Sequence, residues 1–231
     1  MIDQLVIGNK ASFDDFSASV AKREINSPKK KSIKETVPFS NKTYDFSAIN
    51  GEVYWEERQL KYVFEIIADT PTELEDLKTK FSDWVMNVIE ENLHDPHIPD
   101  YHFVATFDDI SYQDEESLEK STITVTFSAY PYKISNEQKT YTFELPTKRG
   151  IQVDIFNASS HKITPTFNGT TEYEVWIDVV WGGSTGTRHS MPAGEVKDEA
   201  IKLEKGNNTF VLNNKADEEC VLTVSFNEEV V

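Results

Sequence analysis

Residues 60–66 read Leu-Lys-Tyr-Val-Phe-Glu-Ile, and residues 70–73, just after them, read Thr-Pro-Thr-Glu. In the first stretch Leu60, Tyr62, Phe64 and Ile66 alternate with other residues, so all four fall on one face of an extended chain. This alternation predicts a β-strand with one face in a hydrophobic core. The second stretch predicts the start of a helix.

The Thr-Pro-Thr-Glu stretch predicts the only convincing helix of the chain, from about residue 71 to residue 93. We expect Thr70 as the N-cap, Pro71 in the first helical position, and Glu73 as the second half of a capping box. Apolar residues then recur at steps of three and four, which predicts a single stripe that packs against a sheet. The stripe consists of Leu74, Leu77, Phe81, Trp84, Val88 and Ile89.

Other alternating segments surround this strand and helix. Tyr101–Phe107 and Ile123–Ala129 predict two more strands in the first half. From about Tyr132 onward the pattern changes to strands alone, separated by turn residues, which is typical of an antiparallel β-sandwich. We therefore expect a mainly β protein with two domains, residues 1–131 and 132–231. The strands expected in the second domain are 141–145, 151–155, 165–167, 173–179, 200–203, 209–212 and 220–226.

The segment Lys22–Lys34 holds six of the 23 basic residues of the chain in thirteen positions, with Pro28 in the middle. A segment of this composition cannot bury a face by itself, so it is expected to form an extended arm or a long hairpin loop. Two interpretations remain open, a solvated loop and an arm that contacts a partner. The residues that would make the contact are Lys29, Lys30, Lys31 and Lys34.

The overall charge limits the classes of function. The 231 residues include 40 acidic and 23 basic side chains, a formal net charge of −17. This balance argues against a protein that coats nucleic acid and against binding to an anionic membrane surface. A single cysteine cannot form an internal disulfide, and no stretch has the features of a signal peptide or a bilayer-spanning segment. We expect synthesis in a reducing cytoplasm and no membrane partner.

The chemical motifs are weak. His94, His97 and His102, with Asp95 and Asp100, are the best candidate metal ligands, but they lie on a Pro-broken loop and share no helical face. The glycine-rich 182–187 segment lacks the Gly-Lys-Ser/Thr ending that holds phosphates, and no Gly-x-Ser-x-Gly elbow occurs. Cys220 falls in an apolar strand, as a core thiol would. We expect no catalytic residues, no metal, no cofactor and no enzymatic activity.

Two tryptophans of the second domain allow a binding function. Trp176 and Trp181 could form a stacking platform for a sugar ring. The alternative is that at least one of them belongs to the sandwich core, since Trp176 lies in an alternating strand. A carbohydrate-binding protein that uses the second domain is therefore the alternative to the function considered next.

The order of several short motifs resembles that of a known family. In the first half these are Tyr44–Ser47 before a turn at Gly51, a Tyr-x-x-x-Arg-x-Leu-x-Tyr-x-Phe pattern over residues 54–64, and the strand Val125–Lys133. In the second half they are Phe156-Asn157, Ile163–Pro165 followed by Gly169, and Leu203–Asn208. Together these motifs resemble the distal tail proteins of long-tailed, non-contractile phages, especially those of Gram-positive hosts.

This resemblance implies a fold and a function. The first domain would be a tail-tube-like β-sandwich or split barrel with one helix and an extended arm, and the second a galectin-like antiparallel β-sandwich. Such proteins form a homohexameric ring in the virion tail tip, between the tail tube protein and the tail-associated hub protein, and their second domains support receptor-binding proteins. DNA passes through the lumen without specific binding.

Physical arguments accompany the resemblance. A ring would pair sheet edges that otherwise invite aggregation, and an acidic lumen would repel the phosphates of passing DNA. The basic segment Lys22–Lys34 could then reach an acidic neighbour as a clasp between subunits. The chain leaves no room for an inserted carbohydrate-binding module, which favours a scaffold over direct sugar binding.

Overall fold

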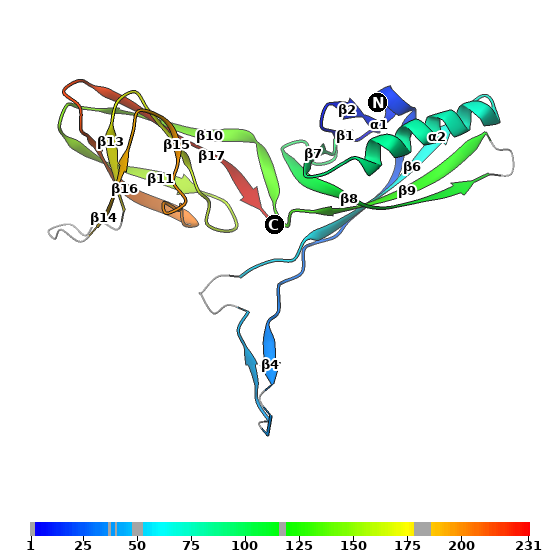
Figure 1. The fold of residues 1–231 in the computed structure, drawn as a ribbon, viewed down its shortest axis with the longest axis horizontal. Helices are drawn as coiled ribbons and strands as arrows, with labels where there is room; N and C mark the ends of the chain where they lie inside the picture. The colour runs from blue at the N-terminus through cyan, green and yellow to red at the C-terminus, as the bar shows by residue number, and fades with distance from the viewer. Residues whose placement is uncertain (1–2, 37, 40, 48–52, 116–118, 178–185) are drawn as a thin grey trace. The chain divides into compact units, whose positions relative to one another are not determined.

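The computed structural model describes residues 3–36, 38–39, 41–47, 53–115, 119–177 and 186–231. The chain divides into two compact units, Met1–Lys133 with Val231, and Ile134–Val230. Both units are mainly β, as Figure 1 shows. Neither helix in these ranges has the length and apolar character needed to cross a membrane. Each unit is described by itself below.

The first unit contains an antiparallel sheet in the order β2-β1-β7-β8-β9-β6-β3. A backbone bond from the Val20 nitrogen to the Asp3 oxygen, 2.8 Å long, ties β3 to the N-terminal segment, so the sheet curls toward closure as a split barrel. The strands are β1 (Val6–Ile7), β2 (Lys10–Ala11), β3 (Ala18–Ile25), β6 (Arg58–Ile67), β7 (Glu91–His94), β8 (Tyr101–Asp114) and β9 (Lys120–Ala129).

The core of this unit forms where the expected alternation is strongest. The residues Leu60, Tyr62, Phe64 and Ile66 of β6 are all fully buried. They lie beside the apolar residues of β9, because the register pairs Leu60 with Phe127 and Phe64 with Ile123. A period of two along both strands therefore places these large apolar side chains on the same face of the sheet.

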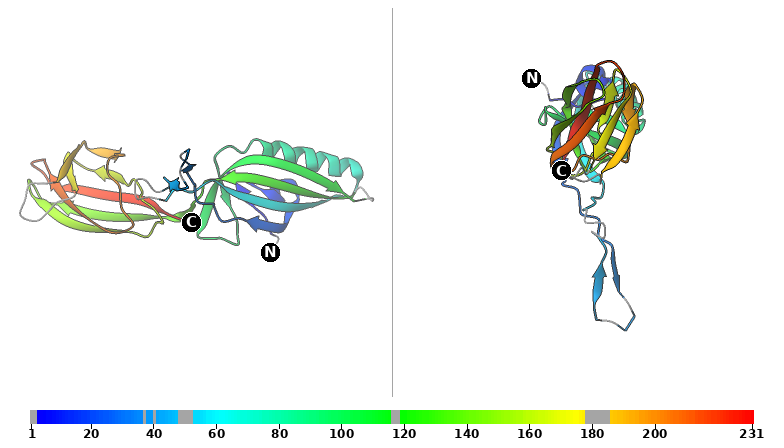
Figure 2. Two further views of the ribbon diagram at one scale, coloured as in Figure 1. Left: turned by 90° about the horizontal axis from the view of Figure 1, so that it is seen from below. Right: turned by 90° about the vertical axis from the view of Figure 1, so that its left-hand side faces the viewer.

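The helix α2 (Pro71–Met86) covers this face, as both Figure 1 and Figure 2 show. Its N-terminus confirms the expected cap, since the Thr70 side chain accepts a hydrogen bond from the Glu73 nitrogen. The Glu73 carboxylate reaches one residue further back than in a standard capping box and accepts from the Asp69 nitrogen at 3.1 Å. Phe81 is buried against the sheet, with its ring centroid 4.9 Å from that of Phe64.

The expected end of this helix at about residue 93 is wrong. The helix ends at Met86, and Leu93 lies in the short strand β7. Ile89, expected in the apolar stripe, is 71% exposed. A five-residue helix, α1 (Ser12–Phe16), was not expected, and its Phe16 ring stacks on the Trp84 ring of α2 at 4.6 Å.

Between β3 and β6 the chain forms an arm, residues 26–57. Its described residues include the short paired strands β4 (Lys34–Thr36) and β5 (Thr43–Asp45). The right-hand view of Figure 2 shows these two strands side by side. The expected arm is confirmed, and it is a hairpin.

The second unit is a sandwich of two four-stranded sheets among its described residues, in the orders β15-β12-β17-β10 and β11-β16-β13-β14. Its core contains Cys220, which is fully buried as expected. The expected strand at 200–203 is wrong, since only Leu203 forms an isolated bridge, to Ile163. The strands are β10 (Lys133–Leu145), β11 (Gly150–Asn157), β12 (Thr166–Gly169), β13 (Tyr173–Ile177), β14 (Thr187–Met191), β15 (Gly194–Lys197), β16 (Gly206–Asn214) and β17 (Cys220–Val230).

The N-cap of α2 gives a direct test of this local structure. We expect Thr70→Ala to lower the free energy of unfolding by about 1 kcal/mol, because the Glu73 nitrogen loses its acceptor. Thr72→Ala, at an exposed position one residue into the helix, is the matched control and should leave stability unchanged or slightly raised. Urea unfolding measures both, and equal losses in the two variants would contradict the capping role.

Candidate assembly surface

The four lysines expected to contact a partner lie on one strand of the arm. Their side chains are exposed, while the backbone around them is paired with the returning strand. The Lys31 nitrogen donates to the Tyr54 oxygen at 2.8 Å, and the Glu56 nitrogen donates to the Lys29 oxygen at 2.7 Å. Lys30 forms a bridge with Trp55, and Lys34 pairs with Asp45. The ladder holds the lysines in an extended row; what they contact stays a prediction.

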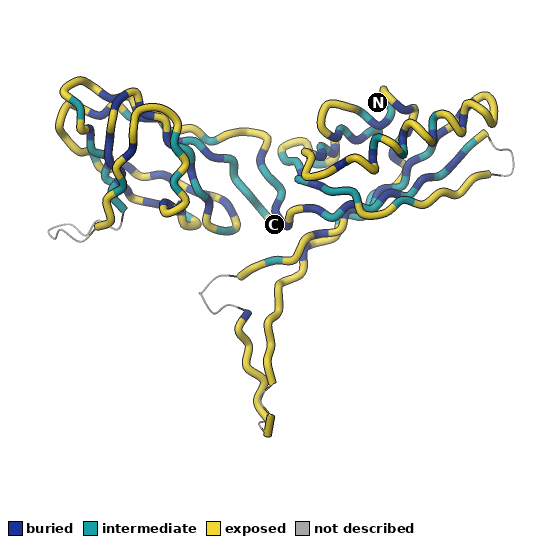
Figure 3. The backbone as a smooth tube through the Cα atoms, in the orientation of Figure 1, coloured by how far each residue is buried: buried dark blue, intermediate teal, exposed yellow. Residues whose placement is uncertain are grey.

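The arm also exposes large apolar side chains. Figure 3 shows it as an almost wholly exposed stretch of chain. Ile33 is 55% exposed, and the stacked rings of Tyr44 and Phe46 have centroids 6.4 Å apart. A two-stranded ribbon with exposed apolar residues is marginal in water unless another surface covers it. The exposed apolar residues of the arm are Ile33, Phe39, Tyr44, Phe46, Val53 and Tyr54.

The charge of the arm differs from that of the remaining chain. Residues 26–57 contain five lysines and five acidic residues, so the arm is neutral and the whole charge of −17 lies outside it. The lysines are concentrated on the outgoing strand, and Glu56 and Glu57 lie near the end of the returning one. An arm with this distribution is attracted to an acidic surface through its outgoing strand.

The base of the arm is fixed by Arg58, the first residue of β6. Arg58 is buried, and its guanidinium donates to the Pro131 oxygen through Nε, at 2.9 Å, and through Nη2. The guanidinium also lies over the Phe103 ring, 5.3 Å from its centroid. Burial lowers the pKa of this arginine from its usual value. These contacts hold the root of the arm against β8 and against the residues just after β9.

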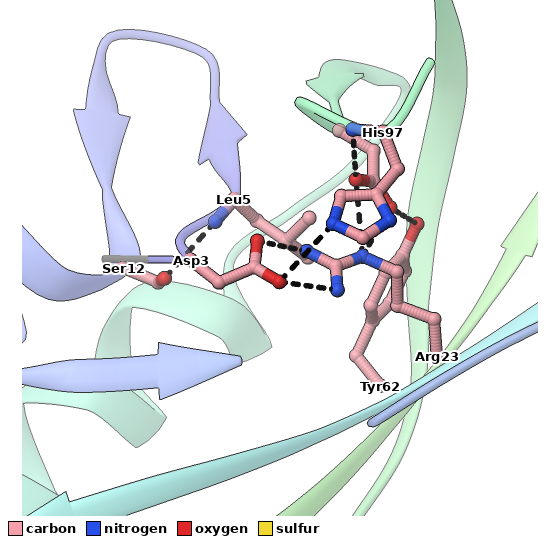
Figure 4. Close-up of polar contacts among 7 residues, drawn as sticks. Asp3, Leu5, Ser12, Arg23, Tyr62 and His97 are labelled. Carbon is pink, nitrogen blue, oxygen red and sulfur yellow. Dashed lines mark hydrogen bonds and ion pairs between the residues drawn. The ribbon is translucent and has the colours of Figure 1, made fainter. Parts of the chain in front are cut away.

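A second arginine, Arg23, links β3 to the N-terminal segment and to the loop after β7. Arg23, on β3, forms paired hydrogen bonds with both carboxylate oxygens of Asp95, through Nε at 2.9 and 3.0 Å. Its Nη1 and Nη2 both donate to Asp3, the former at 2.6 Å. The Tyr62 hydroxyl approaches Asp95 Oδ2 at 3.2 Å. Figure 4 shows these side chains converging from the N-terminal segment, from β3, from β6 and from the loop after β7.

The protonation of this cluster follows from its burial. The hydrogen bonds from Arg23 hold the pKa of Asp3 below its ordinary value of 3.8. Burial, with the neighbouring carboxylate of Asp95, raises the pKa of Tyr62 well above its ordinary value, so its hydroxyl keeps its proton. The cluster is an internal clamp, and its partners lie within the unit.

The three histidines do not converge on one point. His94 and His102 face each other at the end of the β7–β8 ladder, with ring centroids 5.1 Å apart, whereas Nε2 of His97 lies 3.4 Å from Asp3 Oδ2. The loop expected over residues 94–102 is therefore shorter than predicted, because His94 ends β7 and His102 already lies in β8. Among the described residues no group of three or more potential ligands is placed to hold a metal ion.

The structure describes Trp176 but not Trp181, the two residues that could form a stacking platform for a sugar ring. Trp181 lies outside the described residues. Trp176 is partly buried on the outward face of its sheet, because Tyr173 and Val175 of the same strand are the residues that enter the core. Arg188, directly opposite on β14, places its guanidinium 4.1 Å from the Trp176 ring centroid. Sequence reasoning missed Arg188 because residues 187–191 lack an alternating apolar pattern.

A comparison with solved structures identifies the fold of this chain. No protein-family model matches the sequence, and a comparison with curated proteins finds no relative. Among solved structures, the Dit protein of phage SPP1 matches with a TM-score of 0.72 and 12% identity, over 98% of this chain and 99% of that one. It is described as a paradigm of the hub adsorption apparatus in phages that infect Gram-positive hosts. The fold of this chain is therefore that of a phage distal tail protein, as its motifs predicted.

A second likeness is weaker. A chain of the phage P2 baseplate, in an activated conformation with calcium, aligns over 97% of this chain at 10% identity. Its TM-score of 0.44 is too low for a conclusion about the fold.

The clamp around Arg23 predicts a large effect on stability. We expect Arg23→Met to lower the free energy of unfolding by about 3–5 kcal/mol, because Asp95 remains buried without its cation. Lys22→Met removes the neighbouring, exposed cation and should cost about 1 kcal/mol or less. Urea unfolding separates the two variants, and a loss of equal size would contradict the clamp.

The Asp3 carboxylate predicts a dependence on pH. Because the pKa of Asp3 is lower in the folded protein, its contribution to stability is present above the ordinary value of 3.8 and is lost as the pH falls below it. The free energy of unfolding should therefore fall less steeply with acid in Asp3→Asn than in the unaltered chain. Unfolding curves from about pH 6 to about pH 3 measure the slopes. Asp100→Asn, on a loop of the same unit, is the control, and an unchanged slope in Asp3→Asn would refute the assignment.

Proposed function

We propose that the chain is a structural subunit of a phage or prophage tail tip. In this proposal it forms a homohexameric ring that joins the tail tube protein to the tail-associated hub protein and leaves a passage for DNA. The observation that carries the proposal is the likeness to the SPP1 Dit protein along nearly the full length of both chains. The chain would act in the virion, after synthesis in the host cytoplasm, without catalysis and without a cofactor.

The arm supplies a physical reason for self-association. Its six exposed apolar side chains stabilise the arm only when another surface covers them. Its outgoing strand carries Lys29, Lys30, Lys31 and Lys34, whereas the remainder of the chain is acidic, so a second copy is an electrostatically suitable partner. An arm that contacts the next copy makes a head-to-tail interface, and such an interface gives a ring when its rotation closes.

The excess of acidic residues supports the passage of DNA. A lumen lined by this chain would carry negative charge, which repels phosphates and prevents the nonspecific binding that would slow ejection. The second unit is proposed to face outward and to support receptor-binding proteins, as the resemblance to distal tail proteins implies.

The mass of the particle in solution tests the ring. We expect a species of six times 26.4 kDa by light scattering coupled to size exclusion, for the chain alone or with the adjacent hub protein. Replacing Lys29, Lys30 and Lys31 by Glu should shift this species toward the monomer at about 0.15 M salt, because three attractive contacts per interface become repulsive.

The control changes the same amount of charge elsewhere. Arg149, Lys197 and Lys205 are exposed residues of the second unit, and their joint replacement by Glu should leave the mass unchanged. A monomer under all conditions, with and without the hub protein, would overturn the ring. An unchanged mass after the substitution in the arm would overturn the role of the lysines alone.

A further inference from the structure

The outward face of the sheet β11-β16-β13-β14 carries two rows of side chains that cross all four strands. The registers of the three strand pairs place these residues in line. One row is polar and ends at a glycine, and the other joins a cation to an indole. The rows are Ser190, Glu174, Asn213 and Gly150, and Arg188, Trp176, Val211 and Gln152.

Glu174 is buried although it lies on the outward face. Its side chain is only 8% exposed, because three neighbours surround the carboxylate. Lys215 Nζ lies 2.6 Å from Oε1, while the Trp176 indole and the Asn213 amide donate to Oε2 at 3.1 and 3.3 Å. These bonds hold the pKa of Glu174 below its usual value against the opposing effect of burial. The carboxylate therefore fixes the orientation of the indole and of the amide.

The fixed indole in turn orients Arg188. The guanidinium stacks over the indole at 4.1 Å, and the side chain is exposed. Among the described residues no carboxylate pairs with Arg188. A planar guanidinium held in place, with its donors toward solvent, is preorganised for a bidentate bond to a carboxylate. The covered ring of Trp176 also explains why this residue is a support for Arg188 and does not present an open stacking platform.

The residues around Arg188 indicate which kind of ligand this face of the sheet can bind. Lys215, 49% exposed, neutralises Glu174, so among the described residues the charge of Arg188 stays uncompensated on this face of a chain whose net charge is −17. Asn213 and the exposed Ser190 add amide and hydroxyl groups that can bond to hydroxyls, and Gly150 leaves the end of the polar row without a side chain. Neighbouring cationic, amide and hydroxyl groups match a ligand that carries both an acid and several hydroxyls.

We propose that this face binds a saccharide that bears carboxylate groups, with Arg188 holding the acid and Asn213 and Ser190 bonding to the ring hydroxyls. The inference deepens the proposed function and rests on it for the choice of a cell-surface polymer over other acidic ligands. Binding requires only the second unit, so it does not depend on whether a ring forms.

Calorimetric titration of the full chain with hexagalacturonate tests the site. We expect binding at about 0.15 M salt that weakens about tenfold in Arg188→Ala, because the charged bidentate bond is lost. Arg188→Lys keeps the charge but not the fork, so it should bind less tightly than the unaltered chain. It also keeps the test valid if Arg188→Ala fails to fold.

Two matched comparisons decide the outcome. Lys205→Ala removes an exposed cation at the opposite end of β16 and should leave the affinity unchanged. Maltohexaose, a neutral saccharide of equal length, and polyglutamate, an acidic chain without hydroxyls, should both bind at least about tenfold more weakly. Absence of binding to hexagalacturonate, equal losses in Arg188→Ala and Lys205→Ala, or equally tight binding of polyglutamate would each overturn the proposal. The mass of the particle, measured on the same samples, reports separately on the ring.

Discussion

The antiparallel pairing of β3 with β6 is the constraint on which the first unit depends. At one end of this pair, Ala18 opposite Ile66 and Val20 opposite Phe64 enter the core. At the other end the same two strands leave the core and continue as the arm, where the Asn26 nitrogen donates to the Gln59 oxygen at 3.2 Å. One ladder thus both adds the last strand, β3, to the sheet and fixes where the arm begins. A change in this pairing would alter the core and the arm together.

The excess of acidic residues imposes a second constraint, because a carboxylate that enters the interior needs a cation. The chain places a basic residue beside each of two carboxylates that are largely removed from solvent. Arg23 neutralises Asp95 in the first unit, and Lys215 neutralises Glu174 in the second. In both places the carboxylate also accepts a bond from an aromatic side chain, Tyr62 or Trp176, which fixes that ring. The scarce cations therefore serve as positioning groups as well as counter-charges.

The sequence predicted those features that depend on local periodicity. The alternation from Leu60 to Ile66 and the cap at Thr70 are properties of neighbouring residues, so both could be recognised without a structure. The end of α2 could not, because Val88 and Ile89 continue the helical spacing although the helix has already ended at Met86. Likewise, the surroundings of Trp176 depend on Arg188, Asn213 and Lys215, which come from separate segments. The arm was expected from its lysines, but its apolar residues alternate too irregularly to indicate an exposed surface.

The bulge between Val20 and Lys22 has a consequence for how this chain can vary in length. Side chains alternate along a strand, so one inserted residue between the bulge and the tip would turn every later lysine and aromatic residue to the opposite face. Insertions at the tip, between Thr36 and Thr43, leave the alternation below them intact. The arm can therefore lengthen at its turn. An insertion in one of its two strands, in contrast, requires a matching insertion in the other strand to keep the pairing. Natural variation among related chains should follow the same division.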